Sequence, residues 1–385
     1  MNHATWSYPT SIRSGAGRVA ETADVCRAAG ITNPLVVTDP GLVDLAPIAT
    51  VRAVLAAADL GSAVFADLRP NPVGRDVQAG VAAFRSGGHD GVVAVGGGSA
   101  LDVGKVIAFH AGQTRPLWDF EDIGDQWTRA EVDAIAPVVA IPTTAGTGSE
   151  VGRAGVVIDE ATHRKVIIFH PAMLPVTVIA DPELTVGLPR TLTVGTGLDA
   201  LSHSLEAICA PGRHPMSHGI GMEGCRLVFA HLPTAASTPT DLDARGHMLD
   251  AAAMGAVAFQ KGLGAMHALA HPIGAHFDTH HGMTNAVVMP YVLMANRSAI
   301  EPTIERLGAY CDIGTTFDAV VGHILDLRAE LDVPETLVEL GVEPTAVDII
   351  AAAAVEDPSA ATNPVPVDHV YAADVFAAAC EGRLG

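Results

Sequence analysis

The chain changes its pattern of hydrophobic residues at about residue 188. Before this point, short runs rich in valine and isoleucine alternate with amphipathic helical segments, and after it long alanine-rich helical stretches follow one another. Strands that alternate with helices are typical of a parallel sheet, whereas consecutive helices pack as a bundle. We therefore expect two domains, an N-terminal α/β domain over residues 1–185 and a helical domain over 186–385, and the length of 385 residues favours the same division.

The N-terminal half is expected to contain three β-α units in register. Their elements are read from the alternation of buried-strand and helical patterns. Helices are expected at 17–29, 46–58, 73–86 and from residue 100, and strands at 34–39, 62–68, 91–99, 136–142 and 175–184. A hairpin over 155–168 should turn at the segment DEATH, and the later helices should break at 211–215, 238–241 and 332–335.

Composition limits the classes of partner and the location. The net charge of −21 argues against nucleic acid or an anionic membrane, because no basic field is present to displace counterions. No apolar run is long enough to span a bilayer, and the first residues do not resemble a signal peptide, so a cytoplasmic location is expected. The five cysteines form no C-x-x-C pair and are expected to be reduced thiols packed as small apolar residues.

A histidine-rich segment over residues 262–282 has the spacing of metal ligands. His267 and His271 stand four apart on a helical run, and His281 follows ten residues later. Upstream, Asp199 and His203 repeat the spacing with a carboxylate and an imidazole. Two helices that each offer a pair commonly build a buried metal site. The alternative is a set of ordinary core and surface histidines, and spacing alone does not distinguish His267 from His271 as a ligand.

A glycine-rich turn over residues 96–99 lies between an expected buried strand and a helix N-terminus. Such a turn suits a phosphate, since its N–H groups point outward and the helix dipole favours negative charge. It is not the G-x-G-x-x-G fingerprint, and many α/β proteins have glycine-rich turns without ligands. Asp39, at the end of an earlier strand, is suited either to ribose hydroxyls or to a turn before Pro40. The polar loop 143–150 either lines a cofactor site or closes a turn.

Taken together, these segments resemble the iron-containing alcohol dehydrogenases, also called group III alcohol dehydrogenases. The resemblance covers nearly the whole chain and is carried by four motifs in order: VAVGGGSALDVGK, IPTTAGTGSEV, GLDALSHSLEA and GLGAMHALAHPIGAHFDTHHGMTNAV. The family's DPEL, LPR and late TNP segments are also present. The resemblance implies an N-terminal cofactor domain, a helical metal-binding domain and an active site in the cleft between them.

The resemblance also implies roles for individual residues. His271 matches a histidine near the nicotinamide that is usually given a proton-relay or positioning role. The family's four metal ligands match Asp199, His203, His267 and His281. Its cofactor-side positions match Asp39, Asn71, Gly97, Gly98, Ser99, Asp102, Thr143, Thr144, Thr147 and Lys165.

The implied activity is reversible, NAD(H)-dependent oxidation of a small primary alcohol or reduction of its aldehyde. One carboxylate and three imidazoles suit Fe²⁺, Zn²⁺, Mn²⁺ or Co²⁺, and the resemblance favours Fe²⁺. Asp39 is associated with a preference for NAD over NADP. Members of the family are often dimers or larger assemblies, so a homo-oligomer is expected.

The segment Phe259–Gly264 departs from many relatives, because Gln260 and Lys261 stand where those often have small or amide residues. With Phe259 beside it, Lys261 is a candidate to pair with an anionic substrate such as the ω-hydroxy acid 4-hydroxybutyrate or its semialdehyde. The alternative is a lysine whose ammonium reaches solvent. Other possible activities are those of a maleylacetate reductase, a glycerol dehydrogenase, a dehydroquinate-synthase-like lyase and a non-catalytic binding protein.

Overall fold

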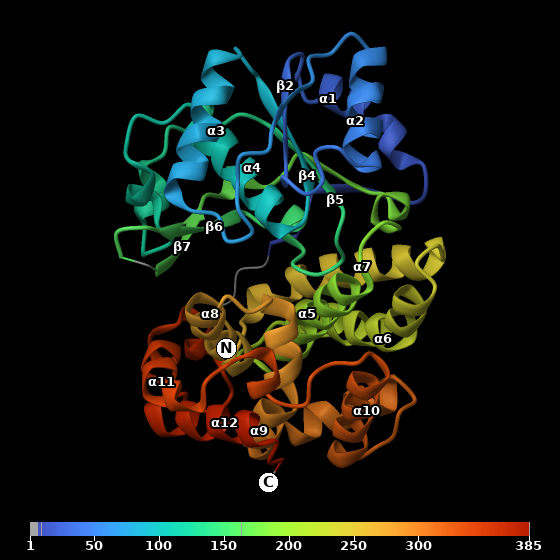
Figure 1. The fold of residues 1–385 in the computed structure, drawn as a ribbon, viewed down its shortest axis with the longest axis vertical. Coiled ribbons are helices and arrows are strands. Elements are labelled where there is room, and N and C mark those ends of the chain that lie inside the picture. The colour runs from blue at the N-terminus through green and yellow to red at the C-terminus, as the bar shows by residue number, and fades with distance from the viewer. Residues whose placement is uncertain (1–6, 9, 163, 385) are drawn as a thin grey trace. The chain divides into compact units, whose positions relative to one another are not determined.

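The computed structural model describes residues 7–8, 10–162 and 164–384, which form two compact units (Figure 1). One unit is Tyr8–Leu188, and the other holds the chain from Pro189 onward together with Ser7. The division after Leu188 lies three residues beyond the boundary expected from the sequence. The first unit is an α/β domain and the second is helical, so the predicted fold class is confirmed.

A six-stranded, all-parallel sheet is the centre of the first unit, with strand order β1-β8-β5-β4-β2-β3. Its strands are β1 (Ser11–Ser14), β2 (Pro34–Thr38), β3 (Ala63–Phe65), β4 (Gly91–Gly96), β5 (Val138–Pro142) and β8 (Thr177–Ala180). The central strands β2, β4 and β5 are buried along their whole length, as parallel strands covered on both faces should be. Strand β1 was not predicted from the sequence.

Four helices pack on this sheet: α1 (Thr22–Ala28), α2 (Ala46–Ala57), α3 (Gly74–Ser86) and α4 (Gly98–His110). The side chains of alternate residues of β4 point to opposite faces of the sheet. Val93 and Val95 belong to the core cluster that includes the apolar side chains of α1 and α2. On the other face Ala94 lies under α4, where a Cβ on Gly104 would be only 2.7 Å from the Ala94 Cβ. Figure 1 shows α1 and α2 on one side of the strands and α3 and α4 on the other.

An antiparallel hairpin extends the first unit beyond the main sheet. Strands β6 (Ala154–Asp159) and β7 (Arg164–Phe169) pair in register from Ala154 opposite Phe169 to Asp159 opposite Arg164. This confirms the predicted hairpin, although His163 in its turn lies outside the described residues. Short 3₁₀ turns fill the connections, among them η1 (Arg18–Glu21), η2 (Leu117–Phe120), η3 (Gln126–Arg129), η4 (Val132–Ala134), η5 (Ser149–Val151), η6 (Pro171–Met173) and η7 (Pro182–Thr185).

The second unit is built of α-helices joined by short turns. Its helices are α5 (Arg190–Cys209), α6 (Pro215–Ser237), α7 (Leu242–Ala258), α8 (Ala265–Phe277), α9 (His281–Tyr310), α10 (Phe317–Glu330), α11 (Val347–Glu356) and α12 (His369–Glu381), and its 3₁₀ turns include η8 (Phe259–Lys261), η9 (Val338–Leu340), η10 (Pro344–Ala346) and η11 (Pro358–Thr362). The first expected break ends at Pro215, the first residue of α6, and the other two fall between helices. At the second break, Asp241 caps α7 by accepting a hydrogen bond from the Ala244 N–H at 2.9 Å.

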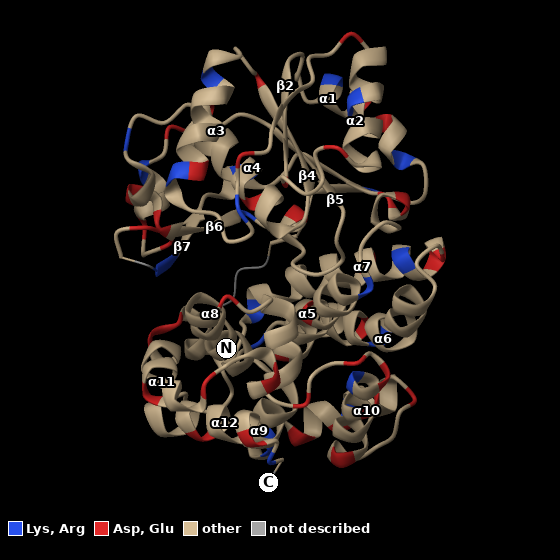
Figure 2. Ribbon diagram, in the orientation of Figure 1, with Lys and Arg blue, Asp and Glu red and all other residues tan. Residues whose placement is uncertain are grey.

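Charged residues are distributed unevenly among these helices. The chain has 43 acidic and 22 basic residues, and Figure 2 shows both kinds scattered over the two units. Helix α8 contains no lysine, arginine, aspartate or glutamate, so any carboxylate that meets its histidines must come from another element. Among the described helices, none is both long and apolar enough to cross a membrane.

Candidate metal centre and cofactor loops

Helix α5 carries two candidate metal ligands on one face. Asp199 and His203 are one turn apart, and both side chains are buried. A third buried polar residue, Glu206, follows three residues after His203 on the same face. Burying three charged or titratable side chains costs folding free energy unless they find hydrogen-bond or charge partners. Polar groups on neighbouring helices must therefore face this side of α5.

Helix α8 brings His267 and His271 to the same region but into different surroundings. The His267 side chain is 2% exposed, and its ring stacks on that of His203 with a centroid separation of 4.8 Å. The His271 side chain is 31% exposed and stacks on the His281 ring at 5.2 Å. The two histidines that the spacing did not distinguish thus lie in different surroundings, and among the described residues the buried group with Asp199 and His203 contains His267.

Helix α9 starts with His281, and a close approach to α5 sets its position. A Cβ on Gly282 would lie 2.1 Å from the Gly195 carbonyl oxygen and 2.9 Å from the Asp199 Cβ. Only glycine fits between the two helices at this point. The contact places the His281 Nε2 atom 3.5 Å from the Asp199 Oδ1 atom.

The four side chains expected to bind metal are thus brought together around Asp199. Potential ligand atoms of Asp199, His203 and His267 all lie within 4.8 Å of one another. The Nε2 atoms of His203 and His267 are each 3.9 Å from Asp199 Oδ1. One carboxylate oxygen and three imidazole nitrogens that converge at these separations match the donor number and chemistry of a four-coordinate divalent cation site.

Asn285 is a further polar residue at this centre. Its side-chain nitrogen donates to Asp199 Oδ1 at 3.0 Å and lies 3.2 Å from His281 Nε2 and 3.4 Å from His267 Nε2. Its side-chain oxygen is buried and has no hydrogen-bond partner among the described residues. Unsatisfied buried acceptors are rare, and this oxygen belongs to the amide whose nitrogen contacts three of the four candidate ligands.

Two carboxylates hold the histidines of α8 by their Nδ1 atoms. Glu206 Oε2 lies 2.6 Å from His267 Nδ1, and Asp357 Oδ2 lies 2.8 Å from His271 Nδ1. Burial alone would lower the pKa of His267, but the charge and hydrogen bond of Glu206 outweigh it and raise that pKa. Burial would raise the pKa of Asp357, but its bonds with His271 and Ser359 prevail and hold it below the usual value.

The two residues expected near the substrate lie on the 3₁₀ turn η8. The Phe259 ring packs edge-on against the His203 ring with centroids 5.1 Å apart, so it adjoins the metal centre. The Lys261 ammonium instead donates to the Ile208 carbonyl oxygen at 3.0 Å, near the end of α5. Burial lowers the pKa of Lys261.

In the α/β unit, the glycine turn is joined to the strand ends on both sides of β4. The Gly97 N–H donates to Asp39 Oδ2 at 3.2 Å, and burial raises the pKa of Asp39. A Cβ on Gly98 would lie 2.8 Å from a Thr147 carbon, and one on Gly97 would lie 3.4 Å from Thr144. The loops after β2, β4 and β5 therefore meet at the N-terminus of α4, where the helix dipole favours an anion.

Asp102 and Lys105 tie α4 to the following loop rather than extend the glycine turn. The Lys105 side chain is 2% exposed, and its ammonium donates to the carbonyl oxygens of Ser149 and Ala154 and pairs with Asp102 at 3.2 Å. The Asp102 carboxylate also accepts from the Ser149 hydroxyl at 2.5 Å and the Val156 N–H at 3.0 Å. This network holds the threonine-rich loop and β6 against α4.

The remaining cofactor-side residues lie around the same turn and along the hairpin. The Ser99 hydroxyl donates to the Pro70 carbonyl oxygen, so Asn71 follows directly after a residue bound to the start of α4. Lys165 is on β7, opposite Ile158. Thr143 is buried, and its hydroxyl has no hydrogen-bond partner among the described residues, which suits a ligand at this strand end. The donors and the glycine turn thus fit a dinucleotide.

Three polar partners of the metal centre were not predicted from the sequence: Glu206, Asn285 and Asp357. Helical spacing contained a signal for two of them, because Glu206 is seven residues after Asp199 and Asn285 is four residues after His281. Asp357 is 86 residues from His271, and no local pattern connects them.

Comparison with known proteins places the chain among metal-dependent dehydrogenases. The family profile described as iron-containing alcohol dehydrogenase matches residues 9–182, and the profile for the C-terminal domain of the same family matches residues 193–380. A 4-hydroxybutyrate dehydrogenase from Cupriavidus necator is 39% identical over 368 residues, which cover 93% of this chain and 94% of that protein.

Solved structures give the same result over the whole chain. The crystal structure of a 1,3-propanediol oxidoreductase superposes with a TM-score of 0.92 and 31% identity, covering 98% of this chain and all of that one. The structure of a sulfoacetaldehyde reductase from Bifidobacterium kashiwanohense in complex with NAD⁺ has a TM-score of 0.90 and 27% identity, and covers 98% of this chain and 99% of that one.

Proposed function

Because this chain belongs to the iron-containing alcohol dehydrogenase family, it is an NAD(H)-linked alcohol dehydrogenase, and we propose that it interconverts an ω-hydroxy acid and its semialdehyde. The observation that carries the proposed chemistry is the convergence of the Asp199 carboxylate and the imidazoles of His203, His267 and His281. A divalent ion in this set supplies Lewis acidity toward the alcohol or carbonyl oxygen, and bound NAD⁺ supplies the hydride acceptor.

The residues of this chain perform binding, orientation and proton transfer. Asp199 and the three histidines would hold the ion, and Asn285 orients the Asp199 carboxylate through its hydrogen bond. The first turn of α4 and the residues Asp39, Thr143, Thr144 and Thr147 bind the dinucleotide.

We assign proton movement to His271. Its Nδ1 atom is held by Asp357, which fixes the ring and leaves Nε2 as the atom that exchanges a proton.

The proposed substrate class comes from the relatives. The Cupriavidus protein is named for 4-hydroxybutyrate, which carries a carboxylate, and the Bifidobacterium protein for sulfoacetaldehyde, which carries a sulfonate. Phe259, packed on His203, is proposed as an apolar wall for the substrate chain. Lys261 remains the candidate anchor for the anion, although its ammonium would have to leave the Ile208 carbonyl to reach it.

A substrate panel tests the proposal. NADH formation is followed with 4-hydroxybutyrate, 1-butanol, 1,3-propanediol and glycerol after anaerobic loading with Fe²⁺, in the wild type and in Lys261→Ala. We expect the highest kcat/KM for 4-hydroxybutyrate. A preference for 1-butanol would contradict the ω-hydroxy acid assignment, and an unchanged preference in Lys261→Ala would remove that residue as the anchor.

Three finer assignments complete the proposal. We propose Fe²⁺ as the resident ion, to be checked by metal analysis of protein purified without oxygen, with Zn²⁺, Mn²⁺ and Co²⁺ as the alternatives. We propose a homo-oligomer, dimeric or larger, to be checked by light scattering coupled to size-exclusion chromatography. The proposed location is the cytoplasm, to be checked by cell fractionation.

A further inference from the structure

The N-terminus of α8 is capped by side chains from other parts of the chain. The residue before the helix is Gly264, which has no side chain to cap the first N–H groups. Asn363 Oδ1 accepts from the Ala265 N–H at 3.0 Å, and Glu206 Oε1 accepts from the Met266 N–H at 2.7 Å. One residue later comes His267, whose Nδ1 atom lies 2.6 Å from the other oxygen of Glu206.

Glu206 therefore acts on both the helix and the imidazole. A carboxylate only accepts hydrogen bonds, so its 2.6 Å contact requires the hydrogen of His267 to be on Nδ1. In the neutral ring the Nε2 lone pair is then available, and this is the atom that faces Asp199 and Asn285.

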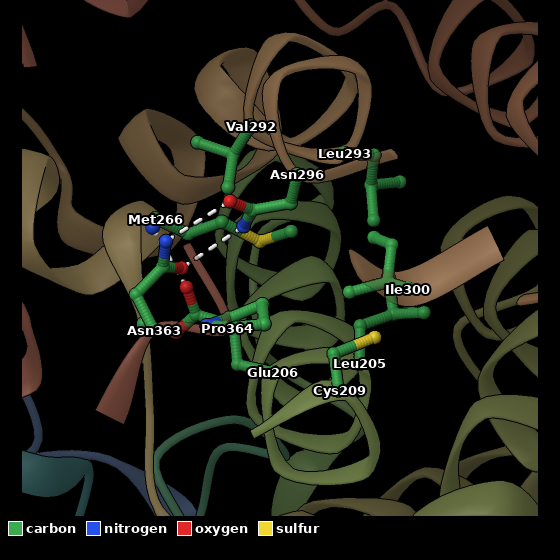
Figure 3. Close-up of a pocket in the computed structure, with 11 residues that line it drawn as sticks. Leu205, Glu206, Cys209, Met266, Val292, Leu293, Asn296, Ile300, Asn363 and Pro364 are labelled. Atoms are coloured by element: carbon green, nitrogen blue, oxygen red, sulfur yellow. Dashed lines mark hydrogen bonds between the residues drawn. The ribbon is translucent and has the colours of Figure 1, made fainter. Parts of the chain in front are cut away.

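The two caps line the same small pocket, which Figure 3 shows with Glu206, Met266, Asn296 and Asn363 around it. The cavity is only about 10 Å³, so it holds one water molecule at most. Asn363 and Asn296 bind each other through two hydrogen bonds of 2.9 Å. Water is therefore largely excluded from Glu206, and its charge is weakly screened.

Asn363 differs from Glu206 in one respect that matters for a test. Its contacts are with the Ala265 N–H, the amide of Asn296 and the Val365 carbonyl oxygen, and none of them is with an imidazole. It stabilises the same helix end without touching a candidate ligand.

We propose that Glu206 is a positioning residue of the metal centre, which fixes the tautomer and orientation of His267 and places a negative charge behind that ring, in addition to the charge of Asp199. The proposal rests on the proposed function, because it requires that Asp199 and the histidines bind a divalent ion. Carboxylates that hold the far nitrogen of a metal-bound histidine typically change metal affinity by about 10- to 100-fold.

The experiment measures metal affinity rather than turnover. The full chain is freed of metal, and the dissociation constants for Zn²⁺ and Co²⁺ are measured by competition with a chromophoric chelator. Glu206→Gln keeps the size of the side chain and removes the charge, whereas Glu206→Asp keeps the charge and withdraws the carboxylate. Asn363→Ala is the control for a loosened helix end, and His267→Ala is the control for a lost ligand.

We expect Glu206→Gln to weaken metal binding about 10- to 100-fold and to shift the visible bands of the Co²⁺ protein, with a smaller loss in Glu206→Asp. Asn363→Ala should lower the Tm of the metal-free protein at least as much as Glu206→Gln does. It should nevertheless change the dissociation constant for the metal less than about threefold. If Glu206→Gln does not fold, the same comparison is made with Glu206→Asp.

Two results would overturn the inference. One is binding within threefold of the wild type in both Glu206 variants, and the other is an equal loss in Asn363→Ala, which would reduce Glu206 to a helix cap. Failure of the wild type to bind either ion would instead refute the proposed function, so the two failures are distinguishable.

Discussion

His267 and His271 show how two identical side chains one helical turn apart acquire different chemistry. His267 is enclosed by α5 and α9 and held by Glu206, whereas His271 is partly exposed and held by Asp357. A buried imidazole with a carboxylate behind it suits a metal ligand, and a half-exposed one suits proton exchange. The difference arises from tertiary contacts.

We predict opposite outcomes for the two alanine variants. His267→Ala should lose stoichiometric metal binding, because a ligand is removed. His271→Ala should retain the metal but lower kcat about 100-fold, as expected for removal of a general acid or base. Metal analysis and a pH profile of kcat check both. Full kcat in His271→Ala across the pH range would refute its role, and retained metal in His267→Ala would refute that of His267.

Glu150 in the threonine-rich loop gives a prediction about pH. Burial raises its pKa from 4.5 to about 7, although Lys105 opposes the shift. Between these two values the folded protein binds more protons at this residue than the unfolded chain does, so the contribution of Glu150 to stability falls as the pH rises.

Replacing Glu150 by Gln removes this penalty. Relative to the wild type, Glu150→Gln should be more stable at pH 8.5 than at pH 5, by about 3 kcal/mol for a shift of this size. Urea unfolding of both proteins at the two pH values measures the difference, and Glu160→Gln, which removes an exposed carboxylate of the same unit, is the control. A stability difference independent of pH would show that Glu150 ionises normally.

At the residue scale, the sequence predicted which side chains gather but only part of what holds them. Asp199, His203, His267 and His281 lie together, as their helical spacing and the family resemblance indicated. The contacts of Asp357 and Asn363 could not be predicted, because they join positions almost a hundred residues apart and depend on how α8 packs in the helical unit. Lys105 is a second example. The sequence motif that contains it was recognised, but its buried contacts with Asp102 and with the carbonyl oxygens of Ser149 and Ala154 were not predicted.

At the scale of elements, the start of α8 leaves no room for an added side-chain carbon. A Cβ on Gly264 would lie 2.7 Å from Asn363 Oδ1 and 3.0 Å from Glu206 Oε1. The backbone there is extended, so alanine is not excluded by its dihedral angles. The obstacle is steric, and it acts on both caps at once.

Gly264→Ala should therefore destabilise the protein by about 1–3 kcal/mol, the range for an overpacked interior, and weaken metal binding. Gly322→Ala is the matched control, since Gly322 is on α10 and a Cβ there would meet nothing within 4 Å. Alanine at that helical position should stabilise the protein by about 0.5–1 kcal/mol. Chemical unfolding of both variants tests this, and equal stability of the two would contradict the steric argument.

The success of the element predictions depends on burial. The central strands and the predicted β6–β7 hairpin form as expected because their apolar patterns are strong. Strand β1 was missed because it is short, largely exposed and polar at both ends, and it is defined by its parallel pairing with β8 far along the chain. The region between α4 and β5 contains three short 3₁₀ turns and one isolated bridge at Glu121, none of which has a periodic signal.

For the whole molecule, the two sets of candidate site residues fall into separate units. The metal centre and its partners belong to the unit that begins at Pro189, and the cofactor loops belong to Tyr8–Leu188. This division of the chain after Leu188 lies close to the point where the pattern of hydrophobic residues changes. Binding of the metal and of the dinucleotide should therefore stabilise different parts of the chain.

This separation predicts two ligand-specific thermal effects. Metal at 100 times its dissociation constant should stabilise the unit that binds it by about 2.7 kcal/mol, and NAD⁺ should act on the other unit. Calorimetry with and without EDTA, repeated with NAD⁺, measures the shifts, and His267→Ala should be insensitive to EDTA. Identical shifts of every transition by both ligands would contradict independent stabilisation of the units.

The positions of the four candidate ligands in the chain have a further consequence. Residues 199 and 281 are 82 positions apart, on α5 and α9, and helices α6, α7 and α8 lie between them in the chain. An ion that joins them closes a long loop, as a cross-link does, and loops of 15 to 100 residues closed by a covalent link lose about 3–5 kcal/mol of chain entropy in the unfolded state. The metal is therefore expected to act also as a reversible cross-link of the helical unit. The stability of that unit should rise when the ion is supplied and fall when it is withdrawn.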